Sequence, residues 1–260
     1  MLPVEILDNI FSRLDIFDLQ ESSLAHLLFS RIAERYLYAD ISLEPHRTKW
    51  TWQRDEDSTL SFTVVQLSDL LSERPRIANY VFSLTISFPD IYEASLPSPA
   101  VRSLLQNLRK ITIGGPGWST DLELPENFWL SLDNWLRLPS VQELGVTEYV
   151  KIPPTFLHHC KDIKTLKINA SSISELGDPE LDSSHDGPLL KDLTIIGVHQ
   201  EVLNRLAPGI AKCCKQLQYF TFSPHFSGGE AFAAIAPIFI SCSDTLTSLE
   251  IRLRSRCKPI

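Results

Sequence analysis

The chain has 260 residues, of which 43% are hydrophobic and 22% are charged, and its formal net charge is −8. This composition is that of a folded globular protein and excludes disorder caused by low hydrophobicity. The net negative charge argues against general binding to nucleic acids or anionic membranes, because both depend on surplus Lys and Arg.

No part of the sequence predicts a signal peptide or a membrane span. Asp8 and Arg13 interrupt the first apolar residues, so no apolar signal core can form. The longest nearly apolar run, 231–240, has about half of the ~20 residues that a membrane span needs. We therefore expect no membrane insertion.

The cysteines are odd in number, and their spacing fits neither a zinc site nor a redox CxxC motif. They are Cys160, Cys213, Cys214, Cys242 and Cys257. We expect reduced, mostly buried thiols in a protein of the cytoplasm, the nucleus or both.

In chain order, the first predicted element is a helix over 2–14. Pro3 suits its first turn, and apolar residues at three- and four-residue spacing share one face. These apolar residues are Leu7, Ile10, Phe11 and Leu14, with Ile6 beside them. Residues 16–43 then predict a second amphipathic helix, whose apolar side holds Leu24, Leu27, Leu28 and Ile32.

Two or three short helices in about 40 residues make a small core. Their surplus apolar surface must therefore pack on the rest of the chain or on a partner. Residues 44–60 are polar and irregular, and we predict a connecting loop there.

From about residue 80, one strand pattern recurs: an apolar residue, any two residues, Leu, any residue, Ile. The copies are VFSLTI (81–86), LRKITI (108–113), VQELGV (141–146), IKTLKI (163–168), LKDLTI (190–195), LQYFTF (217–222) and LTSLEI (246–251). YADISL (38–43) is a possible earlier copy. Helical spacing lies between several copies, at 98–108, 125–139, 201–217 and 229–242.

Strand–helix units of about 27 residues cannot bury their apolar faces alone, so they must stack. The predicted fold class is therefore α/β: a short N-terminal helical module (1–43), a connecting loop (44–60), and a strand–helix solenoid with a parallel sheet (61–260). An ordinary doubly wound sheet is the alternative, although no glycine-rich phosphate loop follows the first strand.

Alternation along the strands divides their side chains between the core and a concave face. The central apolar residues, such as Leu84 and Leu193, then point inward. We predict a substrate-binding face around Lys110, Glu143, Lys167, Asp192, Tyr219 and Arg252. A solvated strand face has the same composition, so that alternative stays open.

No motif for catalysis, a cofactor or a metal ion stands out. His158, His159 and Cys160 form the one dense His/Cys cluster, but adjacent residues on a helix point about 100° apart, which makes a poor metal site. We therefore predict no enzyme activity, no cofactor and no metal site.

The segment LPVEILDNIFSRLDIFDL followed by SLAHLLFSRIAERYLYADISL resembles an F-box of the type common in fungal proteins. The pattern is matched at Leu2, Pro3, Glu5, Ile6, Leu7, Ile10, Phe11, Leu14, Asp18 and Leu19. The following strand pattern resembles the leucine-rich repeats that often follow F-boxes, here in degenerate form.

This resemblance implies a non-catalytic substrate receptor of an SCF-type ubiquitin ligase. The F-box would bind a Skp-type adaptor, and through it a cullin–RING ligase, while the repeats would capture an unknown protein substrate. By the same resemblance, the adaptor contacts would be Leu2, Pro3, Ile6, Leu7, Ile10, Phe11 and Leu14. The alternatives are a standalone repeat scaffold whose N-terminal helices cap the first repeat, and an α/β enzyme.

Overall fold

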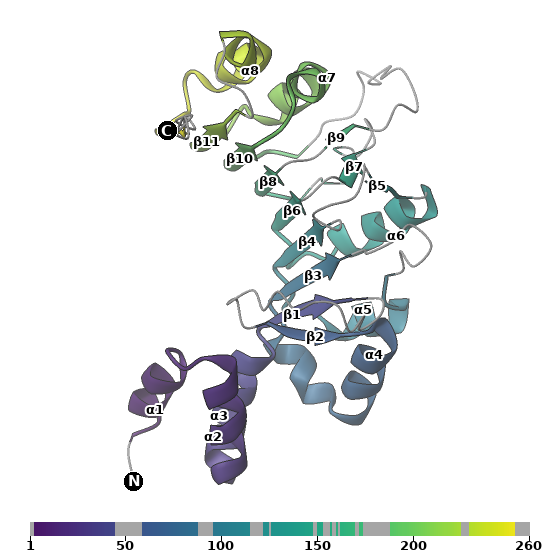
Figure 1. Cartoon of the computed structure of the whole chain (residues 1–260), viewed down its shortest axis with the longest axis vertical. Helices are drawn as coiled ribbons and strands as arrows, with labels where there is room; N and C mark the ends of the chain where they lie inside the picture. Colours follow the sequence, from purple (N-terminus) through teal and green to yellow (C-terminus); the bar gives the residue numbers. More distant parts are fainter. Residues whose placement is uncertain are drawn as a thin grey trace, which may run out of the picture.

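The computed structural model of the chain describes residues 3–44, 59–87, 96–114, 122–124, 126–147, 150–152, 157, 160, 162–169, 172–173, 188–224 and 229–252. These residues form an α/β structure with three parts: an N-terminal group of helices, a long parallel sheet, and helices along one face of that sheet (Figure 1).

Nine described strands form one open sheet in which every pairing is parallel. They are β1 (Asp40–Leu43), β2 (Leu60–Phe62), β3 (Ser83–Ser87), β4 (Lys110–Gly114), β6 (Glu143–Thr147), β8 (Thr165–Asn169), β10 (Asp192–Ile196), β11 (Tyr219–Ser223) and β12 (Ser248–Ile251). From β3 to β12, each strand lies beside the preceding strand of this sheet, so the stack advances in one direction. The order reverses once, at β1, because β2 lies on its other side.

All seven predicted strand segments are strands, and their central residues align across the sheet. One row of paired residues, the first core row, runs Ile41, Leu84, Ile111, Leu144, Leu166, Leu193, Phe220, Leu249. The second core row, two residues further on, runs Leu43, Ile86, Ile113, Val146, Ile168, Ile195, Phe222, Ile251. From β1 to β11, every member of both rows is at most 2% exposed.

Burying an aliphatic or aromatic side chain this completely stabilises the folded state by roughly 1.5–3 kcal/mol. The two core rows therefore explain why the strand pattern recurs so regularly. They also fix the register, because a slip of one residue would turn the apolar side chains of a strand to the opposite face.

The helices between the strands cover one face of the sheet (Figure 1). They are α4 (Val64–Glu73), the 3-10 helix η1 (Pro75–Tyr80), α5 (Pro99–Leu104), α6 (Glu126–Leu136), α7 (Gln200–Cys213) and α8 (Gly229–Cys242). The four helices predicted from spacing are confirmed as α5 to α8. Capping hydrogen bonds mark where two of these helices begin. At α5, Ser98 accepts a hydrogen bond from the Val101 amide, and at α4, Thr63 and Gln66 form a capping box.

A second, smaller parallel sheet was not foreseen from the sequence. It pairs β5 (Leu122–Glu123), β7 (Val150–Ile152) and β9 (Ser172–Ile173) in that order. The short strands β5, β7 and β9 follow β4, β6 and β8 in the chain. The order of strands in the small sheet is therefore the same as the order of those three strands in the main sheet.

The N-terminal residues form a three-helix module, made of α1 (Val4–Phe11), α2 (Ile16–Ala25) and α3 (Leu27–Leu37). The prediction of one helix over 16–43 is wrong. The chain is extended at His26 (φ −160°, ψ 146°), whose side chain accepts a hydrogen bond from the Leu28 amide and so starts a new helix. Residues 40–43, at the end of the predicted 1–43 module, are strand β1 of the main sheet.

The module and the sheet have separate apolar cores. The module core contains Leu7, Phe11, Leu19, Ile32, Ala33 and Leu37. The sheet core contains the two core rows and the helix residues packed on them. Tyr38 packs against both, and its ring stacks on Phe62 at a centroid distance of 6.5 Å. Leu60 of β2 also packs against the module core, so the two cores meet around Tyr38 and β2.

Candidate interaction surfaces

The apolar stripe of α1 is divided between the module core and solvent. Leu7 and Phe11 are 5% and 4% exposed, and the Phe11 ring meets Phe29 edge-on at 5.5 Å. These two predicted adaptor contacts therefore hold α1 onto α2 and α3. Leu14 is half-buried and packs against the same core.

The other predicted contacts face outward. Ile6 is 47% exposed and Ile10 is 45% exposed, and Pro3 at the helix start is also exposed. Leu2 lies outside the described residues. The structure thus leaves Pro3, Ile6 and Ile10 as the members of the predicted set that a partner could reach directly.

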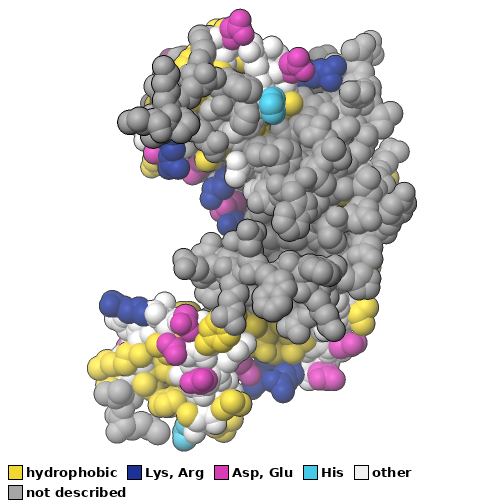
Figure 2. Space-filling view, in the orientation of Figure 1, with side chains coloured by type: hydrophobic (Ala, Val, Ile, Leu, Met, Phe, Trp, Pro, Cys, Tyr) yellow, Lys and Arg dark blue, Asp and Glu magenta, His cyan; other side chains and the backbone are white. Residues whose placement is uncertain are grey.

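Sequence reasoning missed further exposed apolar residues of the module. We define the module patch as Val4, Ile6, Ile10, Phe17, Leu24 and Leu27, which are between 45% and 88% exposed. Leu24 and Leu27, expected on the apolar side of a long helix, instead flank the extended residue His26. Hydrophobic side chains gather visibly over this part of the molecule in Figure 2.

Polar contacts keep α1 in place beside α3. The Tyr36 hydroxyl donates to the carbonyl oxygen of Asp8 at 3.2 Å, and Arg35 lies 4.0 Å from the Asp8 carboxylate. Burial, together with the neighbouring Asp8, raises the pKa of Tyr36. The phenol therefore stays protonated and able to donate this bond at neutral pH.

An ion pair joins the module to the sheet domain. Arg76 of η1 donates from Nη2 to Oε1 of Glu34 at 2.8 Å. The Glu34 side chain is 7% exposed, and its second oxygen, Oε2, has no hydrogen-bond partner among the described residues. A buried carboxylate depends strongly on the cation that pairs with it, here Arg76.

The face of the main sheet opposite α4–α8, here called the open face, carries polar side chains. Its centre is an ion-paired group in which two lysines share one carboxylate oxygen. Lys167 Nζ lies 2.8 Å and Lys110 Nζ 3.7 Å from Glu143 Oε1. Figure 2 shows charged side chains in the hollow on this side, between the module and the C-terminal end of the sheet.

Three further predicted residues lie along the same face. Asp192 and Tyr219 are paired neighbours on β10 and β11, and Tyr219 is 52% exposed. Burial raises the pKa of the Asp192 carboxyl, against the effect of nearby Lys167. Arg252 donates to both carboxylate oxygens of Glu250, at 2.8 and 3.1 Å. Four of the six predicted residues, Lys110, Glu143, Asp192 and Tyr219, lie on one register row across this face. Lys167 lies beside that row through Glu143, and Arg252 lies at the other end of β12.

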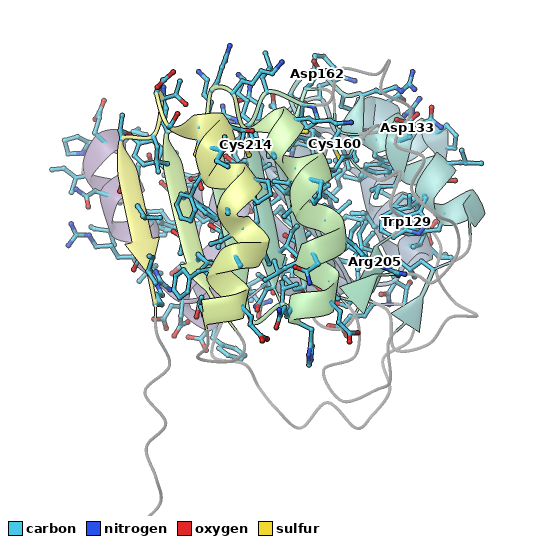
Figure 3. The ribbon with its side chains drawn as sticks, turned by 90° about the horizontal axis from the view of Figure 1, so that it is seen from above. Trp129, Asp133, Cys160, Asp162, Arg205 and Cys214 are labelled. Atoms are coloured by element: carbon cyan, nitrogen blue, oxygen red, sulfur yellow. The ribbon has the colours of Figure 1, made fainter. Side chains whose placement is uncertain are left out.

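The buried thiols lie on the helix side of the sheet. Cys160, Cys213, Cys214 and Cys242 are buried thiols outside any disulfide, as predicted, and Cys257 lies outside the described residues. Burial raises the pKa of all four, that of Cys213 to about 11. In Figure 3, Cys160 and Cys214 lie toward the same end of the strands. A thiol held protonated in this way is a poor nucleophile.

Among the described residues, no group of three or more His, Cys, Asp or Glu side chains could hold a metal ion. His158 and His159 lie outside them. No helix in the described ranges is long and apolar enough to cross a membrane. In comparisons with known proteins, no family model and no curated protein matches this chain.

Proposed function

We propose that this chain is a non-catalytic substrate-recognition adaptor of an SCF-type ubiquitin ligase, acting in the cytoplasm, the nucleus or both. In this proposal the three-helix module is an F-box that docks on a Skp-type adaptor. The sheet with its helices is a degenerate leucine-rich-repeat solenoid, and its open face binds a protein substrate.

The observation that carries the proposal is the module patch. Six large apolar side chains, each at least 45% exposed, are concentrated on three short helices. None of the six belongs to the small module core or to the partly buried residues packed against that core. Exposed apolar surface of this kind is typical of a protein docking site. The resemblance of residues 1–43 to an F-box gives that site a specific partner class.

The strand order supports the solenoid part of the proposal. From β3 onward the sheet grows in one direction, and the helices accumulate on one face. A doubly wound sheet would place helices on both faces. The opposite face is consequently left open along several strands, where a chain of the substrate could lie.

The alternative, a scaffold without a ligase link, would use the module as a cap on the first repeat. Three contacts speak in its favour: the ion pair between Glu34 and Arg76, Tyr38, which packs against both cores, and Leu60 of β2, which packs against the module core. A cap, however, should contribute its apolar face to the core that it closes. The module instead packs its buried residues into a separate core, which favours docking on a partner.

Titration calorimetry of the full chain with a Skp-type adaptor tests the proposal. We expect a one-to-one complex that is weakened at least about tenfold by Ile6→Ala combined with Ile10→Ala, because a few apolar anchors usually dominate an interface. Both residues are about half exposed, so the variant should keep its fold.

The matched control is Ile240→Ala, which removes an aliphatic side chain that is 76% exposed on α8, far from the module in the sequence. This variant should bind like the parent chain. The ligase proposal is wrong if the parent chain forms no complex at tens of micromolar, or if the control loses as much affinity as the double variant.

A further inference from the structure

The open face carries a carboxylate without a bonded cation. Among the described residues, Asp192 of β10 forms no ion pair and no side-chain hydrogen bond. Lys167 is close enough to lower the pKa of this carboxyl, but the Lys167 ammonium lies 2.8 Å from Glu143 Oε1. Burying a carboxylate that lacks a bonded partner is unfavourable. Asp192 would therefore gain from an added cation.

Tyr219 places an aromatic ring beside this carboxylate. Asp192 and Tyr219 are register partners on the adjacent strands β10 and β11, so their side chains leave the same face about 4.8 Å apart at the backbone. Tyr219 is 52% exposed. Lys167 lies on β8, on the other side of β10, and extends from there toward β6. It therefore does not occupy the Tyr219 side of Asp192.

The space around this acid–aromatic pair is bordered by short side chains. Along the row of the pair, and in the next row of β10 and β11, the flanking residues all carry small hydroxyl groups. They are Thr165, Ser248, Thr194 and Thr221. Short side chains leave room for a ligand group above the carboxylate and the ring, and their hydroxyl oxygens can accept hydrogen bonds from bound N–H groups.

We propose that Asp192 and Tyr219 bind an arginine side chain of the protein that the open face recognises. The carboxylate would accept hydrogen bonds from the guanidinium group, while the planar cation would stack on the tyrosine ring. The net charge of −8 favours the approach of a basic segment. The inference rests on the proposed function, because it names a basic segment as the substrate feature that the open face selects.

An acidic segment fits this face less well. Lys110 and Lys167 already share one carboxylate oxygen of Glu143, so an incoming carboxylate would compete with that contact. It would also meet the charge of Asp192, which has the same sign. An arginine at Asp192 and Tyr219 leaves the group of Lys110, Glu143 and Lys167 intact.

A nuclear magnetic resonance titration of the isotopically labelled full chain tests this proposal. The probe is the blocked peptide acetyl-Gly-Gly-Arg-Gly-Gly-amide, and the signals are the side-chain carboxyl carbon of Asp192 and the ring of Tyr219. We expect saturable shifts of both, with a dissociation constant on the order of 1–10 mM, because a single half-exposed anchor binds weakly. The same peptide with citrulline, which keeps the shape and removes the charge, should give no saturable shift.

Substitutions assign the two roles. Asp192→Asn should weaken binding at least about fivefold, because it removes the charge that faces the guanidinium group. Tyr219→Leu should weaken binding about twofold or more, because it keeps an apolar side chain and removes the aromatic face. Asp40→Asn is the matched control, since Asp40 is an exposed acid in the same register row at β1. This control should bind the peptide like the parent chain.

Four results would overturn the proposal: no saturable shift at tens of millimolar, equal binding of the citrulline peptide, an equal loss in Asp40→Asn and Asp192→Asn, or tighter binding of a Gly-Gly-Glu-Gly-Gly peptide at the same two residues. The titration contains no Skp-type adaptor, and Asp192→Asn should bind that adaptor like the parent chain. A failure of arginine binding therefore leaves the ligase proposal standing, and a failure of adaptor binding leaves the arginine site standing.

Discussion

Glu34 is the charged side chain that the described residues bury most deeply, at 5% residue exposure. Its oxygen Oε1 meets Arg76, and its oxygen Oε2 is without a described partner. Burial of a charge is costly unless the charge is paired, so this residue depends on a single neighbour from another element. The dependence makes the pair measurable by mutation.

We expect Arg76→Ala to lower the free energy of unfolding by roughly 1–3 kcal/mol, because it leaves a buried carboxylate unpaired. Glu34→Gln should relieve most of that loss in the double variant, so a double-mutant cycle measured by urea unfolding should show coupling. Arg252→Ala is the control, because both side chains of its pair with Glu250 are more than half exposed, so losing the pair should change the free energy of unfolding little. Equal losses in Arg76→Ala and Arg252→Ala would contradict this account.

Because of the buried thiols, the free energy of unfolding should depend on pH in the alkaline range. The folded state raises the pKa of Cys213 from 9.0 to about 11, and burial is the main cause. Between these two pH values the folded chain keeps this proton while the unfolded chain loses it. The contribution of Cys213 to the free energy of unfolding is therefore fully present below about pH 9 and is lost as the pH rises toward 11. The loss from this thiol should approach about 3 kcal/mol.

The measurement is the urea midpoint under reducing conditions between pH 8 and pH 11, compared between the parent chain and Cys213→Ala. The variant will be less stable at pH 8 because it has a cavity, so the slope against pH is the informative quantity, and it should be shallower in the variant. Parallel slopes would show that Cys213 does not titrate in this window.

At the scale of single elements, an interior position and the last position of the first core row give a matched pair of substitutions. Leu193 of β10 is 0% exposed, whereas Leu249 of β12 is 45% exposed. Leu193→Ala should cost about 2–5 kcal/mol through lost burial and a cavity, and Leu249→Ala should cost about 1 kcal/mol or less. Thermal unfolding of the two variants gives both values. Similar losses at the two positions would mean that β12 is covered in solution.

The strands of the main sheet could be predicted because their signal is local. Leu84, Leu144 and Leu193 each lie in a short stretch whose alternation already shows which side is buried, and their alignment follows from stacking like on like. The strands β5, β7 and β9 could not be predicted. They have two or three residues each, so their pairing depends on partner strands 28 and 21 residues away in the chain and not on their own composition.

Two further differences between the sequence predictions and the structure arise from specific contacts. The break at His26 depends on one imidazole nitrogen accepting the Leu28 amide, and His is not among the usual residues at a helix start. In the candidate interaction surfaces, the spacing of apolar residues in α1 predicted an apolar face. It did not predict which of those residues are buried in the module core and which are exposed. Only the packing of α2 and α3 shows that Leu7 and Phe11 point into the module core while Ile6 and Ile10 do not.

At the scale of the whole molecule, the two separate cores predict two levels of stability. The module buries few side chains, and it meets the sheet domain at Tyr38, at Leu60 and at the Glu34–Arg76 pair. We expect amides of α1–α3 to exchange with solvent through local opening at a lower free energy than amides of β4–β11. Hydrogen exchange with mass spectrometry measures both in one experiment.

Addition of a Skp-type adaptor should slow exchange in α1–α3 and leave β4–β11 unchanged. If the module is as protected as the sheet without any partner, the two open as one cooperative unit, and the cap alternative gains support over the ligase proposal.

The one-directional order of strands also determines how the protein would respond to force. From β3 to β12, each strand is hydrogen-bonded only to the strands before and after it in the stack. Tension applied at the two ends of the chain would therefore peel strands from the edge one after another instead of shearing the sheet as a block. Each detached unit of about 27 residues would release roughly 90 Å of extended chain. The molecule would yield to a pull in small, nearly equal steps.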